Sequence, residues 1–211
     1  MKRQLMRGVT TVAVTALALV APATPARASI SGEIEFACTA TLPVFPSVTG
    51  VGTCGGGTGP VPGRAVVEVQ GVDTAGHPFV VTGVGDFDAA FVYSEPCPPL
   101  PLPVSPTIGT AVGTASITGL TAVHYGIPPT LVGAQITATF VWTRAGNSAV
   151  VVLTSLQISF TNGHSAVVAS PLGNSVGGWA TAAFAPLPGA GTCVAPAPTK
   201  AVVTGTANIP V

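Results

Sequence analysis

The fold class is indicated most directly by the stretch AQITATFVWT at residues 134–143. Apolar side chains occupy every second position, so that Ile136, Phe140 and Trp142 share one face of an extended chain. Threonine, glutamine and valine occupy the positions between them. A period of two predicts a β-strand with one buried face, and it places Trp142 in the core.

The same pattern recurs on both sides of this stretch. After a turn at 144–147, residues 150–160 alternate again, and the two segments predict a long central hairpin. Turns are also expected at 74–78 and at Asn162-Gly163, the latter a favoured hairpin dipeptide. Further strands are expected at 33–40, 67–70, 86–94, 165–170, 178–185 and 201–209.

These segments predict an all-β protein of roughly nine or ten strands at the spacing of a sandwich. We expect a single antiparallel β-sandwich over residues 29–211, Ig-like in architecture. The proline-rich run at 96–103 has two interpretations, since such runs favour extended polyproline II. A rigid crossover within one domain is preferred, because the segment before it is too short to form a stable domain alone; an inter-domain linker is the alternative.

Composition excludes two classes of protein. The chain of 211 residues has seven Lys and Arg, seven Asp and Glu, and 47% hydrophobic residues. So few basic residues cannot neutralise a row of phosphates, which argues against a nucleic-acid partner. The hydrophobic content is too high for a disordered chain.

The N-terminus has the pattern of an export signal. Basic residues within the first seven positions precede an apolar run at 9–21 and the small-residue motif Ala26-Arg27-Ala28. This order predicts a signal peptide over residues 1–28 and a secreted, extracellular product beginning at Ser29. No cysteine near the cut could carry a bacterial lipid anchor, and we expect no membrane anchor after cleavage.

Removal of this segment leaves a nearly uncharged protein. Three basic residues remain, Arg64, Arg144 and Lys200, together with seven acidic residues. The predicted mature protein therefore has a net charge of −4. Sparse charge together with Val- and Thr-rich strands favours association with surfaces or with other copies of the chain.

Four cysteines in an exported chain predict two disulfides. Three pairings exist, and we favour Cys38–Cys54, a local link between the first two strands, together with Cys97–Cys193. No two cysteines have the close C-x-x-C spacing that is typical of zinc ligands.

The chain contains one nucleophile-like motif, GNSVG at residues 173–177, which matches the G-x-S-x-G pattern of α/β-hydrolases. In that fold an acid and a histidine must follow the serine. No Asp, Glu or His follows Ser175, so this hypothesis is rejected.

The segment TAGH at 74–77 resembles the one that carries the catalytic histidine in chymotrypsin-like serine proteases. The resemblance implies a trio of His77, an aspartate (Asp88 or Asp86) and Ser175. The chain departs from the family pattern around each residue: a proline follows the histidine, GNSVGG replaces Gly-Asp-Ser-Gly-Gly, and the aspartates lie close to the histidine. We therefore expect a turn at His77 and a loop at Ser175, with a divergent serine hydrolase as an alternative.

No metal or cofactor is assigned from the sequence. Asp86 and Asp88 lie two apart on a strand and could share a hard cation, but two solvated acids on the outer face are preferred. The three histidines, His77, His124 and His164, lack the local spacing that aims two imidazoles at one ion.

Aromatic residues are the last candidates for a binding site. Trp179 and Tyr125 are candidates for a platform that binds sugar rings, but packing of both residues in the core is preferred. The preferred function is a non-catalytic extracellular binding or surface-associated module, with a polysaccharide or protein partner. A self-associating structural surface protein is the third hypothesis.

Overall fold

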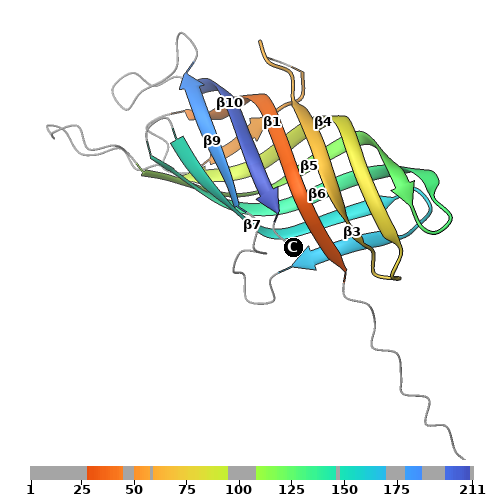
Figure 1. Ribbon diagram of the computed structural model, residues 1–211. Coiled ribbons are helices and arrows are strands. Elements are labelled where there is room, and N and C mark those ends of the chain that lie inside the picture. The colour runs from red at the N-terminus through yellow and green to blue at the C-terminus, as the bar shows by residue number, and fades with distance from the viewer. Residues whose placement is uncertain are drawn as a thin grey trace, which may run out of the picture.

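The computed structural model describes residues 28–44, 50–57, 59–94, 108–145, 148–169, 179–186 and 198–209 (Figure 1). These residues form ten β-strands and no helix, and none of them lies in a helix able to cross a lipid bilayer. The strands are β1 (Ser29–Val44), β2 (Gly50–Cys54), β3 (Arg64–Val72), β4 (Pro78–Ser94), β5 (Ile108–Tyr125), β6 (Thr130–Ala145), β7 (Ser148–Phe160), β8 (Ser165–Ala169), β9 (Trp179–Pro186) and β10 (Pro198–Ile209).

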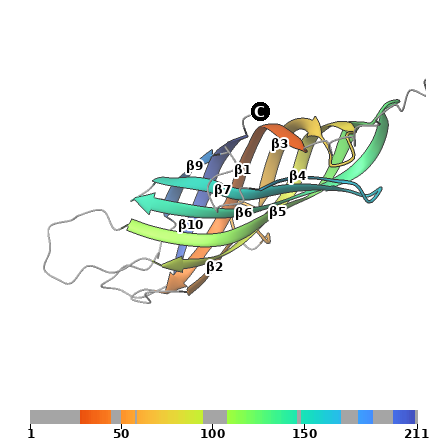
Figure 2. The same cartoon turned by 90° about the horizontal axis from the view of Figure 1, so that it is seen from below.

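All ten strands belong to one antiparallel sheet that closes on itself. Its order is β10-β9-β7-β6-β5-β4-β2-β1-β3, and the pairing of β1 with β10 joins its two sides (Figures 1 and 2). β3 pairs with both β1 and β4, while β8 pairs with β7. The all-β antiparallel prediction is confirmed. The facing walls of this one sheet pack across a common apolar interior, as the two layers of a sandwich would.

The interior is built by strict alternation of side chains. In β3, Ala65, Val67 and Val69 are buried while the residues between them are exposed. Trp142 is buried on β6, as its phase predicts. In β7 the buried phase changes at Thr154, where a bulge inserts one residue. The bulge keeps both halves of β7 facing inward.

Several inward aromatic rings lie over glycines. A Cβ at Gly52 would lie 2.2 Å from the ring of Phe91, and one at Gly205 would lie 2.4 Å from the ring of Phe36. Glycine therefore makes room for the large rings that fill the interior. Phe36 in turn stacks on Phe87, with ring centroids 5.1 Å apart.

The disulfide predicted between Cys38 and Cys54 is present, with the two Cα atoms 5.5 Å apart. It links β1 to β2, and both cysteines are buried. Cys97 and Cys193 lie outside the described residues, as does the predicted signal segment up to residue 27. The pairing of Cys97 with Cys193 and the cleavage site therefore stay predictions.

The central hairpin is confirmed as β6 and β7, and the predicted turns at 74–78 and 162–163 connect β3 to β4 and β7 to β8. One long strand, β5, was not predicted. The proline-rich run at 96–103 lies outside the described residues. The strands on either side of it, β4 and β5, pair directly with each other.

Candidate functional site

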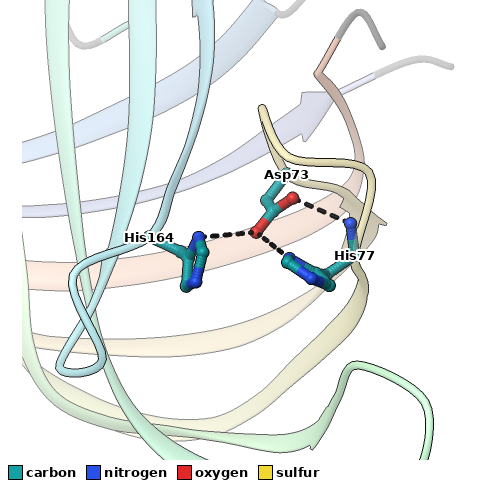
Figure 3. A group of neighbouring side chains, drawn as sticks. All are labelled: Asp73, His77 and His164. Atoms are coloured by element: carbon teal, nitrogen blue, oxygen red, sulfur yellow. Dashed lines mark hydrogen bonds and ion pairs between the residues drawn. The ribbon is translucent and has the colours of Figure 1, made fainter.

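Two hairpin turns and the end of β5 meet at one end of the closed sheet. The β3–β4 turn carries Asp73 and His77, and the β7–β8 turn carries His164 (Figure 3). The turns are tied together because Thr74 donates hydrogen bonds to the carbonyl of Ser165 from its backbone N–H and from its hydroxyl, both at 3.0 Å. These hydrogen bonds hold the two turns side by side, although Thr74 and Ser165 are 91 positions apart in the sequence.

The β3–β4 turn is organised by Asp73. Its Oδ1 accepts hydrogen bonds from the backbone N–H groups of Ala75 and His77, both at 2.8 Å. Gly76 donates its own N–H to the Asp73 carbonyl and adopts a φ of 89°, which favours glycine. An aspartate that bonds to the backbone a few residues later is typical of such turns.

The second carboxylate oxygen of Asp73 faces three side chains. The Tyr125 hydroxyl donates to Oδ2 at 2.5 Å, and the His77 Nδ1 lies 3.1 Å from the same oxygen. The His164 Nδ1 lies 3.8 Å away. The two imidazole rings meet edge to face, with centroids 4.9 Å apart. Asp73 is 0% exposed, whereas the His77 and His164 side chains are 43% and 41% exposed. The cluster therefore has a buried acid and an open, imidazole-lined outer side.

These contacts shift the pKa values of two groups. Burial acts to raise the pKa of Asp73, but hydrogen bonds from Tyr125, His77 and Ala75 outweigh it and hold that pKa below its ordinary value of 3.8. Burial and the hydrogen bond to Asp73 raise the pKa of Tyr125 to about 12. Asp73 is therefore a carboxylate at neutral pH, and Tyr125 is a neutral hydrogen-bond donor.

The hydrolase trio implied by resemblance is not assembled among the described residues. The carboxylate beside His77 is Asp73, whereas Asp88 lies eleven residues along the chain, on the outer face of β4. Ser175 lies outside the described residues, so its position relative to His77 stays untested.

The acids at 86 and 88 are both exposed on the outer face, as expected from their spacing. Asp86 forms a hydrogen-bonded ion pair with Arg64 on the neighbouring strand, N to O 2.5 Å. A pair this exposed contributes little to stability.

Of the two aromatic residues proposed as a sugar platform, Tyr125 is buried and 5% exposed. Its ring packs against Phe160, with centroids 4.7 Å apart, and its hydroxyl is engaged with Asp73. Trp179 begins β9, where its backbone pairs with Val152 and Asn208. The Trp179 side chain lies outside the described part, so a ligand role for it stays a prediction.

The sequence reasoning missed Asp73 and the pairing of His77 with His164. The spacing of residues in the sequence can reveal a pair of metal ligands only when both lie on the same strand or turn. These two histidines come from different hairpins. The sequence did contain one signal for this pairing. His77 and His164 each follow a glycine in a predicted turn, in the similar segments TAGH and TNGH.

A second feature is a groove of about 910 Å³ on the outer wall. It crosses β6, β7, β9, β10, β1 and β3 and has hydroxyl groups along much of its lining. The polar and charged side chains that line it are Thr143, Ser148, Thr181, Thr204, Thr206, Glu35 and Arg64.

The groove follows a row of small inward residues. Gly205 pairs with Ala182, and Ala182 pairs with Ala149, across β10, β9 and β7. These three inward positions bring little side-chain volume to the interior. On β1 the next position is the large residue Phe36, which is the register partner of Gly205 and also lines the groove.

Comparisons with protein-family models, with curated proteins and with solved structures find no match for this chain.

Proposed function

We propose that this protein is an exported, non-catalytic binding module whose outer-wall groove holds a segment of an extracellular polysaccharide. The observation that carries the proposal is the groove across six strands with its hydroxyl-bearing lining. Export is supported by the N-terminal pattern of basic, apolar and small residues. The disulfide between Cys38 and Cys54 is consistent with an oxidising compartment.

The chemistry of the lining favours a neutral, hydroxyl-rich polymer. Threonine and serine hydroxyls both donate and accept hydrogen bonds, as sugar hydroxyls do. The groove has one acidic and one basic residue, Glu35 and Arg64, and the Arg64 side chain is paired with Asp86. Such a surface has little net field to attract a polyanion. Val66 and Val150, 48% and 55% exposed, supply apolar contacts for the faces of sugar rings.

The dimensions favour an extended ligand over a small compact one. Six neighbouring strands span five intervals of about 4.8 Å, or roughly 24 Å along the curved wall. The floor is formed by paired strands, so the groove is pre-formed and its ordering costs little on binding.

Binding to insoluble cell-wall polysaccharide, measured by co-sedimentation over a range of polymer concentration, tests the proposal. Thr181→Trp fills the groove with a bulky ring and should abolish retention, while Thr114→Trp makes the same change on β5 outside it and should not. Trp179→Ala tests the aromatic residue at the start of the same strand, β9. Equal retention of wild type and Thr181→Trp, or no retention of wild type by any polysaccharide, would contradict the proposal.

A row of exposed valines favours self-association as a second candidate function. Val51, Val92, Val112 and Val141 are 74%, 53%, 62% and 38% exposed. They are register neighbours across β2, β4, β5 and β6, so they form one continuous apolar line on the outer face. Low charge around such a line leaves little to oppose contact between copies.

Sedimentation velocity over a hundredfold range of protein concentration distinguishes this candidate. Assembly that depends on concentration without any polysaccharide, and that Val112→Lys removes, would support it. A monomer at every concentration would eliminate self-association and leave the polysaccharide proposal intact.

A further inference from the structure

The cluster at the turn end of the sheet contains three side chains of metal-ligating type. Asp73, His77 and His164 each offer one ligand atom, and these atoms all lie within 4.8 Å of one another (Figure 3). The proposed polysaccharide groove does not use them. We propose that Asp73, His77 and His164 form a binding site for one divalent transition-metal ion of the zinc class.

The distances suit a tetrahedral ion after a small adjustment. Ligand bonds of about 2.0–2.2 Å in a tetrahedron place neighbouring ligand atoms roughly 3.3 Å apart. The Asp73 Oδ2 lies 3.1 Å from the His77 Nδ1 and 3.8 Å from the His164 Nδ1. These two distances bracket the required separation, and all three ligand atoms lie within 4.8 Å of one another. Closure around an ion therefore needs the two partly exposed rings to move towards each other and towards Asp73.

The ligand types select the ion. Two imidazoles and one carboxylate suit zinc and its neighbours, whereas calcium and magnesium prefer sites made of oxygen atoms alone. A buried carboxylate needs compensation for its charge. The ion-pair contacts of Asp73 among the described residues are with these two histidines, and a bound dication would supply that compensation.

The carboxylate is already oriented for this role. The backbone N–H groups of Ala75 and His77 hold Oδ1, and the Tyr125 hydroxyl donates to Oδ2. Outer contacts of this kind fix a ligand's direction before the metal arrives. Oδ2 has a second lone pair, which is the one available for the ion.

The two turns are also pre-assembled. Thr74 follows Asp73, Ser165 follows His164, and the two hydrogen bonds between them hold the ligand-bearing turns together. The exposed sides of both rings leave a fourth position open to water. Three protein ligands and one water molecule would complete the four-coordinate geometry that zinc prefers.

The same distances fit a second arrangement in which His77 simply donates a hydrogen bond from Nδ1 to Asp73. The two arrangements differ in whether the Nδ1 atom of His77 carries a proton. A bound ion requires the Nδ1 atoms of both histidines to be unprotonated. Metal titration separates them, since a hydrogen-bonded pair alone has no affinity for zinc that depends on His164.

The test is calorimetric titration of chelator-treated full-length protein with zinc chloride, with cobalt(II) as a spectroscopic probe. Wild type should bind one ion per chain, and cobalt should give the strong visible absorption of a tetrahedral site. His164→Ala should weaken zinc binding by at least about tenfold and remove the cobalt band. His124→Ala alters an exposed histidine on β5 outside the cluster and should leave both unchanged.

His77→Gln serves as the second ligand variant should His164→Ala fail to fold, as judged by its circular dichroism. No zinc binding by wild type would overturn the proposal, as would equal affinities of wild type, His164→Ala and His77→Gln. Polysaccharide retention of the ligand variants should stay at the wild-type level, so a failed metal site leaves the groove proposal standing.

Discussion

The phenol of Tyr125, at the end of β5, donates a 2.5 Å hydrogen bond to the buried carboxylate of Asp73, at the start of the β3–β4 turn. Both groups are in the interior, at 5% and 0% exposure. The contact joins residues 52 positions apart and secures the turn that carries His77.

Tyr125 should ionise late in an alkaline titration. Its pKa is raised from 10.0 to about 12, so the stability that this contact adds is fully present below pH 10 and is lost as pH rises towards 12. Ultraviolet absorbance of the folded protein should show a phenolate step near pH 12 that Tyr125→Phe removes. A step near pH 10 that disappears in the same variant would contradict the buried hydrogen bond.

Asp73 should make the protein sensitive to acid. Because its pKa is lowered in the folded protein, the ionised Asp73 carboxylate contributes its full stabilisation above pH 3.8. That stabilisation is lost as the pH falls through the pKa of the folded state. Asp73→Asn should cost about 1.5–3 kcal/mol of unfolding free energy at neutral pH, because hydrogen bonds to a charged acceptor weaken. Its stability should then change less with acid than that of wild type. Urea unfolding at neutral and acid pH measures both effects.

Asp88→Asn is the matched control, since Asp88 is exposed on the outer face of β4. It should change the urea midpoint little at neutral pH. Equal losses in the Asp73 and Asp88 variants would show that the turn contributes nothing particular to stability.

Gly205 should tolerate no side chain. A Cβ there would lie 2.4 Å from the Phe36 ring and 2.6 Å from the Thr181 carbonyl oxygen, so Phe36 would have to leave its stack on Phe87. Gly205→Val should lower the free energy of unfolding by about 1–3 kcal/mol. Thr204→Val, on the outward face of the same strand, should be nearly neutral in the same chemical denaturation; a similar loss in both would contradict the packing of this wall.

The Cys38–Cys54 disulfide should stabilise the sheet through the unfolded chain. It closes a loop with a sequence separation of 16, which corresponds to about 3 kcal/mol in the chain-entropy description. The double variant Cys38→Ala/Cys54→Ala should therefore unfold at a clearly lower temperature in calorimetry. An unchanged midpoint would mean that the link adds no constraint.

Much of the fold could be predicted from sequence because β3, β6 and the halves of β7 alternate without interruption. β5 could not, although it is the longest strand, at 18 residues. Its register with β6 shifts between Ile117 and Leu120 and again between Ala122 and Tyr125. Each register shift changes which alternate positions face the interior. A search for strict alternation of apolar residues therefore does not detect this strand.

The site was less predictable for a different physical reason. Asp73 and His77 lie in one turn, and their contact follows from local turn geometry. His164 reaches them only because the closed sheet brings β8 beside the β3–β4 turn, a non-local contact that spacing in the sequence does not encode. The groove likewise takes its lining from strands that become neighbours only through pairing.

The central structural claim is that β1 and β10 pair and close the sheet, since the groove floor crosses this seam. Glu33 is the register partner of Asn208 there. Cysteines at directly opposed positions lie within disulfide reach, whereas a shift of two residues places them about 7–8 Å apart, beyond it. Peptide mapping of oxidised Glu33→Cys/Asn208→Cys should show the new cross-link in nearly all molecules, and Glu33→Cys/Thr206→Cys should show little. A cross-link absent from the first variant, or equally abundant in both, would contradict the closed sheet.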